Sequence, residues 1–424
     1  MERTGKTAAL CNAVALCAVG AEKVVSNEIK KLGLAVLDSG FGKVRFQADT
    51  AGLYRALMAL RAADRVLLEA GYFHAADFDA LFEGALAVSW ESVVPARLGL
   101  KVGKVRSNRS QLKAQSSIQA VVHKAAAQRL CEAAGLARLP EARAAAELRV
   151  YVEKDMVSLL VDLSGQPLFK RGYRPEGGVA PLRETTAAAM LLLSGWKRKY
   201  PLYDPFCGSG TILAEALIYA WDMAPGLGRR FAIDNLCIAD DSIGEAVREE
   251  LRGKVNFQRA IRIAGSDGDA SAAALAKSNL ERAQGLLNKL HPADEKSPSI
   301  GPLSANVFVE DITQRRKERK EEQGIFESAD SICASVPLCD EFRDNDPRGF
   351  IVTNPPYGKR LGDKQESERI YAGMASLAED FPGWKLAVIT DHPGFESFFG
   401  RKADSCREIT GGPIPAFFYQ YERL

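Results

Sequence analysis

The chain contains a strand, a glycine-rich turn and a helix in direct succession. An apolar run ends at Asp204, residues 204–211 read DPFCGSGT, and an Ala- and Leu-rich helical pattern follows over residues 212–217. Glycines in such a turn let the backbone approach a ligand closely, and the first turn of the helix offers free N–H groups. The segment therefore predicts a ligand-binding site where a strand ends and a helix begins.

Residue identities around this turn narrow the class of ligand. A dinucleotide-binding turn needs a third glycine near position 213, where this chain has Leu213. A phosphate-binding loop of the Walker type needs a lysine after the glycine, and Thr211 stands there instead. The turn therefore fits a nucleoside ligand that has no pyrophosphate.

The sequence around the turn alternates strand and helix patterns, which is typical of a parallel sheet with crossover helices. The strands that we expect are 202–204, 262–266, 307–309, 350–353 and 386–390. Residues 407–410 and 416–421 have the pattern of an antiparallel hairpin. The C-terminal part is thus expected to contain five parallel strands and a terminal hairpin.

A second motif follows the strand expected over residues 350–353, where residues 353–358 read TNPPYG. Prolines fix φ and lack an N–H, so nearby carbonyl groups can point at a ligand. Asn354 and the carbonyl of Pro355 can both accept hydrogen bonds from an exocyclic amino group, while Tyr357 can stack on the base that carries it. The motif indicates a site for a nucleobase amine, although by itself it could also be a strand-to-loop turn.

The first 172 residues show two smaller α/β patterns. Residues 13–60 have the order strand, helix, strand, strand, helix, which predicts a ferredoxin-like domain over residues 1–64. Residues 65–172 predict a second mixed domain with a helix over 116–134. The Pro- and Gly-containing segment 174–178 predicts a flexible linker. The third expected domain comprises residues 173–424.

The net charge of +2 is close to neutral, so contact with a nucleic acid must come from a local basic patch. Residues 101–113 contain five basic residues and no acidic one, with Ser, Asn and Gln interleaved, which suits phosphate contacts of low sequence specificity. The alternative is a solvated loop before the helix that begins near residue 116. The residues expected to contact phosphate are Lys104, Arg106, Arg109, Lys113, Lys124, Arg171 and Arg174.

Cysteine and histidine positions predict neither a metal site nor a disulfide framework. The eight cysteines include no C-x-x-C pair, and the four histidines are scattered. The apolar segment 8–19 is interrupted by Asn12 and has no cleavage pattern after it, so it predicts a buried strand rather than a signal or membrane segment. We therefore expect a reducing, cytoplasmic compartment and no membrane partner.

Taken together, these motifs resemble those of THUMP-domain class I RNA methyltransferases, of the type that makes N2-methylguanine in large-subunit ribosomal RNA. The resemblance covers nearly the whole chain. It rests on segments in matching order, namely 168–174, 180–185, 204–211, 265–269, 354–358, 381–384, 411–414 and 419–421. It implies an α/β chain with a C-terminal Rossmann-like methyltransferase domain, preceded by ferredoxin-like and THUMP RNA-binding domains, and S-adenosylmethionine as the cofactor.

The resemblance also implies roles for individual residues. Asp204 would orient the methionine end of the cofactor, Asp267 would accept its ribose hydroxyls, and Asp311 would contact its adenine amine. For Asp267 and Asp311 the alternative is helix capping or turn chemistry. The cofactor-binding residues expected are Asp204, Phe206, Gly208, Ser209, Gly210, Thr211, Asp267 and Asp311. The catalytic residues expected are Asn354, Pro355, Pro356 and Tyr357.

The mechanism that follows is direct methyl transfer. Hydrogen bonds to Asn354 Oδ1 and the Pro355 carbonyl would draw the weakly nucleophilic N2 amine toward tetrahedral geometry and stabilise its developing positive charge. Tyr357 would stack on the base, which must first leave its RNA helix. No covalent nucleophile is needed, so Cys207 is expected to be a small buried residue.

Three functions are compatible with these motifs. The favoured one is guanine-N2 methylation of ribosomal RNA, and the second is methylation of transfer RNA or of adenine N6, because the Asn-Pro-Pro-Tyr motif serves both amines. The third is an RNA-binding assembly factor with an inactive methyltransferase fold. The intact residues at the expected site argue against it, since an inactive site would have no reason to keep them.

An insertion is expected over residues 312–348, because the 42 residues between Asp311 and Asn354 exceed what one crossover needs. Its charge-rich run, residues 314–323, predicts an exposed helix with paired charges. Contact of this run with RNA is the alternative.

Overall fold

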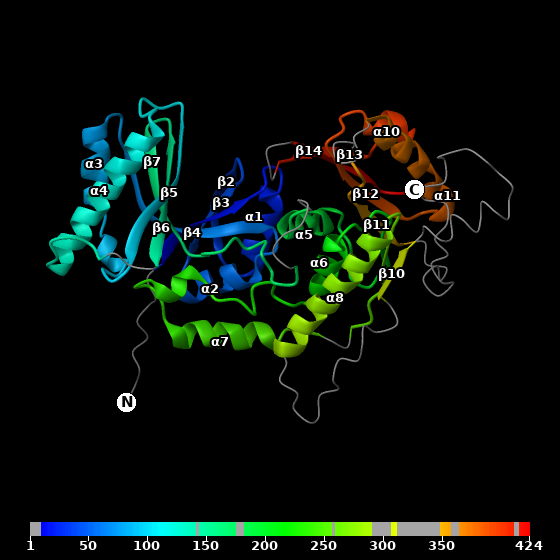
Figure 1. Ribbon diagram of the computed structural model, residues 1–424, viewed down its shortest axis with the longest axis horizontal. Coiled ribbons are helices and arrows are strands. Elements are labelled where there is room, and N and C mark those ends of the chain that lie inside the picture. Colours follow the sequence, from blue (N-terminus) through cyan, green and yellow to red (C-terminus); the bar gives the residue numbers. More distant parts are fainter. Residues whose placement is uncertain are drawn as a thin grey trace, which may run out of the picture. The chain divides into compact units, whose positions relative to one another are not determined.

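The computed structural model describes residues 10–140, 144–174, 182–256, 259–290, 307–311, 348–357, 364–410 and 415–424. The chain divides into two units, and neither is one continuous stretch of sequence. The N-terminal unit comprises Met1–Leu16, Val25–Leu168 and Arg229–Glu250, and the C-terminal unit comprises Cys17–Val24, Phe169–Gly228 and Leu251–Leu424. Figure 1 shows the elements of both units in the colours of the sequence.

The N-terminal unit contains a seven-stranded sheet with the order β2-β3-β1-β4-β7-β6-β5. Its strands are β1 (Cys11–Cys17), β2 (Ala35–Gly40), β3 (Lys43–Ala48), β4 (Ala63–His74), β5 (Gly99–Asn108), β6 (Ala145–Glu153) and β7 (Met156–Asp162). Its helices include α1 (Glu22–Lys31), α2 (Thr50–Ala59), α3 (Phe78–Leu86), the short η1 (Trp90–Ser92) and α4 (Gln115–Ala134). The returning segment adds η2 (Ala232–Asn235) and most of α7 (Asp241–Arg252).

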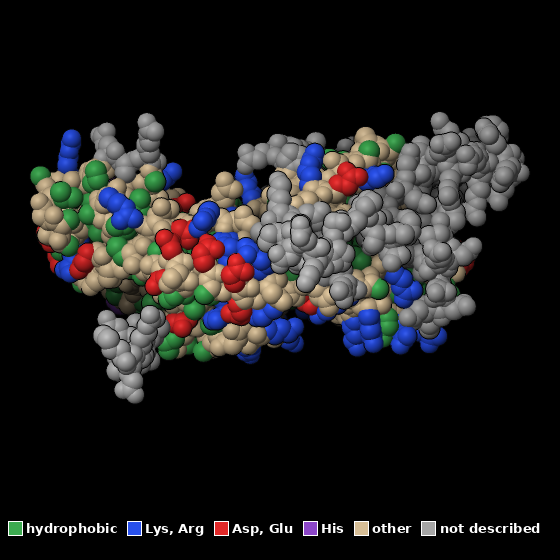
Figure 2. Space-filling view, turned by 90° about the horizontal axis from the view of Figure 1, so that it is seen from below, with side chains coloured by type: hydrophobic (Ala, Val, Ile, Leu, Met, Phe, Trp, Pro, Cys, Tyr) green, Lys and Arg blue, Asp and Glu red, His purple; other side chains and the backbone are tan. Residues whose placement is uncertain are grey.

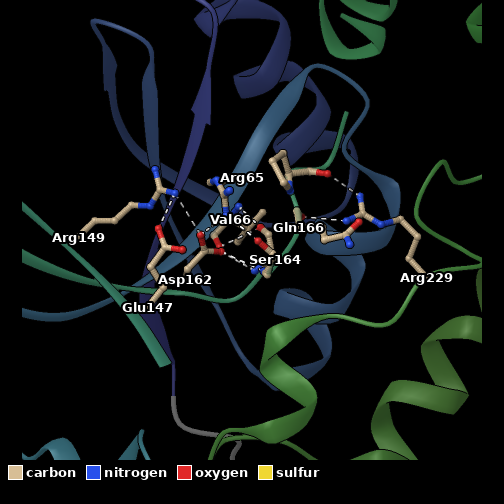
Figure 3. A network of polar contacts seen from close by, with 10 residues as sticks. Arg65, Val66, Glu147, Arg149, Asp162, Ser164, Gln166 and Arg229 are labelled. Carbon is tan, nitrogen blue, oxygen red and sulfur yellow. Dashed lines mark hydrogen bonds and ion pairs between the residues drawn. The ribbon is translucent and has the colours of Figure 1, made fainter. Parts of the chain in front are cut away.

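A buried polar network joins three strands of this sheet (Figure 3). Asp162, at the end of β7, is 2% exposed and pairs with Arg65 of β4 and, at 3.5 Å, with Arg149 of β6. Its other oxygen accepts the backbone N–H of Ser164 at 2.8 Å. Burial raises the pKa of the Asp162 carboxyl, and the two guanidinium groups oppose that rise. The network fixes the end of β7.

Arg229 belongs to the segment that returns to the N-terminal unit. Its guanidinium donates to three successive backbone carbonyls, those of Gln166 at 2.8 Å, Pro167 at 3.0 Å and Leu168 at 3.1 Å (Figure 3). One side chain therefore satisfies the last three acceptors of the chain before it leaves this unit at Leu168.

The C-terminal unit contains a second seven-stranded sheet, in the order β10-β9-β8-β11-β12-β14-β13. Its strands are β8 (Leu202–Asp204), β9 (Ile263–Asp267), β10 (Val307–Asp311), β11 (Phe350–Thr353), β12 (Lys385–Thr390), β13 (Ser405–Ile409) and β14 (Ala416–Tyr421). The first five are parallel, and β14 pairs antiparallel with both β12 and β13. Numbered along the unit, the strand order is 3-2-1-4-5-7-6.

Helices cover both faces of this sheet. They are α5 (Glu184–Leu193), α6 (Thr211–Ala220), α8 (Ala270–Leu290), α10 (Lys364–Gly373), η4 (Met374–Ser376), α11 (Leu377–Asp380) and α12 (Phe395–Phe399). All residues of β8 and β11 are buried, as expected for parallel strands packed on both sides. On one face, Tyr371 of α10 and Phe395 of α12 pack with strand residues such as Val388 in one apolar cluster. Figure 1 shows α6 and α8 together, away from α10.

The two-sheet α/β fold and the parallel sheet with its antiparallel hairpin are therefore as the sequence predicts. Two features differ in detail. Strands on either side of residue 64, which the sequence assigns to separate domains, lie in one sheet. The basic segment from Lys101 to Asn108 is part of the edge strand β5, so only the residues after it form a loop. Within the described residues, no helix is long and apolar enough to cross a membrane.

Candidate active site

The carboxyl ends of β8, β9 and β10 bring the three expected aspartates to one edge of the sheet. Asp204 is paired in register with Gly265, and Asp267 with Asp311. Because these strands are parallel, their ends face the same side, where ligands bind in open α/β sheets. The backbone therefore places all three positions at one edge of the sheet. For Asp311 the structure describes the backbone only.

Asp204 is a buried carboxylate that has no cationic partner within the described part of the chain. It is 1% exposed, and its Oδ1 accepts the Thr353 hydroxyl at 2.7 Å and the backbone N–H of Phe206 at 3.2 Å. Burial raises its pKa to about 7, and the two hydrogen bonds only partly oppose that rise. A carboxyl in this state is poised to gain charge when a cation binds next to it.

The contact between Thr353 and Asp204 joins the two sequence motifs directly. Thr353 ends β11 and precedes Asn354, whereas Asp204 ends β8 and begins the glycine turn. The two strands are neighbours, with Ile351 opposite Tyr203 in register. Residues separated by 149 positions in the chain are thus held within one hydrogen bond.

The glycine turn has the open backbone that a close ligand requires. Gly208 has φ +52°, and a Cβ built there would meet no described atom within 4 Å. Gly210 has φ +75°, and a Cβ there would lie 2.9 Å from the Cβ of Ala276, so a larger residue would push the turn away from α8. Asn279 of α8 donates to the Ser209 carbonyl at 2.9 Å. No side chain of the described residues caps the N-terminus of α6.

Asp267 accepts hydrogen bonds from three backbone N–H groups within this edge, those of Gly208, Gly268 and Asp269. Its Oδ2 accepts the N–H of Gly208 at 2.8 Å, and its Oδ1 accepts the N–H of Asp269 at 3.0 Å. The bond from Asp269 is the turn chemistry considered above as the alternative role, but the carboxylate retains a further lone pair. Burial raises the pKa of Asp267. Asp269 in turn accepts the N–H of Ser271 at the start of α8, as an N-cap residue does.

The Asn-Pro-Pro-Tyr loop is held from two sides. The Tyr357 hydroxyl donates to Asn354 Oδ1, which fixes the orientation of the amide. The Tyr371 hydroxyl donates to the Pro356 carbonyl at 2.9 Å and lies 2.9 Å from Thr390 Oγ1. The Tyr357 hydroxyl is thus engaged with Asn354, and the stacking role expected for its ring stays a prediction. An amide oxygen has two lone pairs, so Asn354 can still accept a further donor.

Two of the arginines expected to contact RNA pair with carboxylates inside the C-terminal unit. Arg171 is buried, at 4% exposed, and pairs with the equally buried Glu215 of α6 at 3.4 Å. Arg174 pairs with Glu184 at 2.9 Å and donates to Thr211 Oγ1 at 3.0 Å. Arg171 is buried and Arg174 is half-buried, and each guanidinium is paired with a carboxylate, so these surroundings do not favour the expected contact with phosphate. Both arginines instead support α6 and the turn that precedes it.

The other expected RNA-contacting residues are exposed. Lys104 and Arg106 stand two residues apart on β5 and therefore share one face of this edge strand, while Arg109 and Lys113 follow in the loop. Lys124 is exposed on α4, with its ammonium group 5.5 Å from the ring centroid of Phe82.

Several expectations fall outside the described residues. These are Gly358, the linker from Pro175 onward and the charge-rich run 314–323. Among the residues that the structure describes, no group of three or more His, Cys, Asp or Glu could hold a metal ion.

Sequence reasoning missed several residues that organise the site. Thr353 belongs to the TNPPYG motif, but the sequence assigns no function to it. Its place at the end of a strand, next to Asn354, is a usable signal for a role in the site. Nothing in the local sequence of Tyr371 or Asn279 indicates that they hold the Pro356 carbonyl and the glycine turn. Tyr203, whose hydroxyl lies 2.6 Å from Ser266 Oγ beneath the turn, is a further example.

Two family models match this chain. Residues 171–291 and 308–418 match the family described as "RMKL-like, methyltransferase domain". Residues 12–67 match the family described as "RlmL ferredoxin-like domain". The two matches fall on the C-terminal sheet with its helices and on the first strands of the N-terminal unit.

Relatives of similar length agree with these matches. A Bacillus subtilis protein named "Putative RNA methyltransferase YpsC" is 32% identical over 412 residues, which cover 96% of this chain and 95% of the relative. The crystal structure of "a predicted N6-adenine-specific DNA methylase" from Listeria monocytogenes is 32% identical, with a TM-score of 0.79 over 97% of this chain and 96% of that one. The crystal structure of "SMU.472, a putative methyltransferase complexed with SAH" is 29% identical, with a TM-score of 0.79 over 98% of both chains.

Proposed function

Because this chain belongs to the family of RMKL-like methyltransferase domains, whose cofactor is S-adenosylmethionine, we propose that it methylates the exocyclic amine of a base in RNA. The favoured target is guanine N2 in large-subunit ribosomal RNA. The observation that carries the proposal is the hydrogen bond between Thr353 and Asp204, which brings the amine-binding motif to the glycine turn.

The residues at this edge fit a cofactor that carries both a cation and a carboxylate. The buried carboxyl of Asp204 offers a partner for the positively charged end, and the uncapped N-terminus of α6 offers N–H groups to the carboxylate. The remaining lone pair of Asp267 suits a ribose hydroxyl, and Asp311, next to it in register, suits the adenine amine. Gly208 leaves its backbone open to the ligand.

The cofactor supplies a methyl group bound to a positively charged sulfur. Asn354 Oδ1 and the Pro355 carbonyl accept hydrogen bonds from the target amine and orient its lone pair along the line of attack. As the nitrogen–carbon bond forms, the carbon–sulfur bond breaks with its electron pair remaining on sulfur, and the amine then releases one proton to water. Tyr357 orients the Asn354 amide, and Tyr371 fixes the loop one residue beyond Pro355 by its hydrogen bond to the Pro356 carbonyl.

The choice between bases rests on the resemblance to N2-guanine enzymes, because Asn354 and its neighbours can accept from either amine. Adenine N6 is the second candidate, and it is favoured by the Listeria neighbour, which is described as a predicted N6-adenine-specific DNA methylase. RNA rather than DNA is proposed because the Bacillus relative is named a putative RNA methyltransferase. The exposed basic residues on β5 and in the loop after it suit the phosphates of either nucleic acid.

The test is transfer of labelled methyl from S-adenosylmethionine to total RNA from cells that lack the protein, followed by nucleoside analysis of the separated RNA classes. Wild type is compared with Asn354→Ala and with Asn235→Ala, an exposed asparagine outside the site that serves as the control. We expect N2-methylguanine in large ribosomal RNA with wild type and Asn235→Ala, and a loss of at least about 100-fold with Asn354→Ala.

Other outcomes identify the alternatives. Detection of N6-methyladenine would show that the target base is adenine rather than guanine. Label in transfer RNA would show that the substrate is transfer RNA rather than ribosomal RNA. Cofactor binding without methyl transfer to any RNA class would contradict the proposed substrate. Absence of cofactor binding would indicate an RNA-binding assembly factor with an inactive methyltransferase fold.

A further inference from the structure

Basic residues gather where the parallel strands of the C-terminal unit begin, at the sheet edge opposite the candidate active site. This set, called the basic edge below, comprises Lys197, Arg198, Lys199, Arg259, Arg262, Arg348 and Lys385. Backbone hydrogen bonds place their segments side by side, from Phe350 to the Pro201 carbonyl at 2.9 Å and from Lys385 to the Gly349 carbonyl at 3.0 Å. Figure 2, a view from below, shows Lys and Arg side chains gathered along its lower right-hand margin.

Aromatic rings position several of these cations. The guanidinium of Arg348 lies 4.8 Å and the ammonium of Lys199 lies 5.1 Å from the ring centroid of Tyr200. Tyr200 stacks on Phe350 at 6.3 Å, and Lys385 lies 5.9 Å from the Phe350 ring. A ring attracts a cation without cancelling its charge, whereas a carboxylate cancels it. These ring contacts therefore orient Lys199, Arg348 and Lys385 without themselves cancelling the charge.

Acidic side chains neutralise only part of this charge. Asp222 pairs with Arg198 and, at 3.0 Å, with Arg259, and Glu422 pairs with Lys385. Lys197 and Lys199 are exposed, and neither forms an ion pair with another of the described residues. Lys197 and Lys199 therefore present positive charge to solvent that no acid among the described residues pairs with.

We propose that the basic edge binds the phosphate backbone of the substrate RNA at a stretch remote from the target base. This inference rests on the proposed RNA substrate and adds a second contact surface to it. Along β11, the six residue steps from Arg348 to Asn354 correspond to about 20 Å. A strand of only two or three nucleotides bound at the Asn-Pro-Pro-Tyr loop does not reach that far, whereas a large folded RNA does. Non-specific phosphate contacts of this kind set affinity and orientation rather than base choice.

The test compares wild type with Lys197→Glu/Lys199→Glu, and with Lys30→Glu/Lys31→Glu as a control of equal charge change on the exposed end of α1. The probes are a folded fragment of large-subunit ribosomal RNA, a single-stranded RNA of about three nucleotides, which is too short to span both surfaces, and a DNA duplex, each titrated over a series of salt concentrations. For the folded RNA we expect the Kd of the first variant to rise about tenfold, with a salt slope smaller by about 2. Binding of the short RNA and of S-adenosylmethionine should stay at the wild-type level, which also shows that the variant is folded.

Each of the remaining outcomes contradicts a defined part of the proposal. If the folded RNA binds the first variant as tightly as wild type, or if the control variant weakens equally, the basic edge is not an RNA surface. If binding of the DNA duplex depends on the same lysines as strongly as binding of the folded RNA does, the proposal that this surface is specific for RNA is wrong. If wild type binds and methylates no RNA at all, the proposed function fails together with this inference.

Discussion

Two almost completely buried carboxylates, Asp162 in the N-terminal unit and Asp204 in the C-terminal unit, have contrasting surroundings. Asp162 pairs with the guanidinium groups of Arg65 and Arg149. Asp204 accepts hydrogen bonds from a hydroxyl and a backbone N–H, and within the described residues no Lys or Arg pairs with it.

A buried charge is costly unless a partner of opposite charge compensates it. The partners of Asp162 belong to the protein itself, which is how a structural contact is built. The carboxyl of Asp204 lacks such a partner in the described part of the chain, so its charged form is compensated only when a ligand brings the cation. The contrast separates a contact that stabilises the fold from one that is completed by binding.

The largest effect on stability is expected for Asp162→Asn. The substitution removes the charge that Arg65 and Arg149 share, and it should lower the free energy of unfolding by about 3 kcal/mol. Cofactor affinity should not change. Urea unfolding measures the first quantity, and the exposed Asp79→Asn is the control, expected within about 0.5 kcal/mol of wild type. A loss of cofactor affinity with unchanged stability would contradict the structural role that distinguishes Asp162 from Asp204.

Asp204→Asn should show the reverse pattern. The amide keeps an acceptor for Thr353 but loses the charge, so the Kd for S-adenosylmethionine should rise about 100-fold, equivalent to about 2.7 kcal/mol. The ligand-free variant should be at least as stable as wild type at pH 8, because no charge is then buried. Calorimetric titration and thermal unfolding measure the two effects. Wild-type affinity in the variant would mean that Asp204 does not serve the cofactor.

The pH dependence sharpens the same contrast. The folded-state pKa of Asp204, about 7, is raised above its ordinary value of 3.8, so the folded state holds a proton that the unfolded state releases. Its contribution to stability is present below pH 3.8 and is lost as the pH rises through 7, by up to about 4 kcal/mol for about 3 pH units. Cofactor binding needs the charged form, so affinity should increase from pH 6 to pH 8.

Thermal unfolding with and without S-adenosylmethionine across this range measures the effect. The rise in Tm that the cofactor produces should grow with pH in wild type, and this growth should disappear in Asp204→Asn. A pH-independent rise in wild type would contradict a role for this carboxyl.

The smallest effect is expected for Thr353→Val, which keeps the shape of the side chain and removes the hydroxyl donor. Loss of a hydrogen bond to a charged group costs about 1.5 kcal/mol, so cofactor affinity should fall about tenfold. The pKa of Asp204 should rise further, which moves the pH dependence of binding toward higher pH. Unchanged affinity and an unchanged pH profile would show that Asp204 functions without this donor.

Much of the fold could be predicted from the sequence because its signals are local. Apolar runs such as 350–353 and 386–390 become buried strands, and the glycine turn after Asp204 and the loop after Thr353 lie at the ends of neighbouring strands. The register that places Asp267 beside Asp311 follows from the same parallel arrangement.

What could not be predicted depends on partners that are distant in the chain. The arginines at 171 and 174 look exposed in a basic, glycine-containing segment, and only the fold brings Glu215 and Glu184 to them. The support of the Pro356 carbonyl by Tyr371 likewise requires α10 to be in place. Local sequence carries no record of such contacts.

The division of the chain also has a consequence for its synthesis. The N-terminal unit needs the segment Arg229–Glu250, and Arg229 donates to the last carbonyls before Leu168. A growing chain can therefore complete its first unit only after residue 250 has left the ribosome, when the first helices of the second unit have already emerged. A gene fragment that starts after Leu168 would lack the Cys17–Val24 segment and would carry Arg229–Glu250 without its sheet. A cut after Leu168 would therefore take from each unit a segment that its compact structure includes.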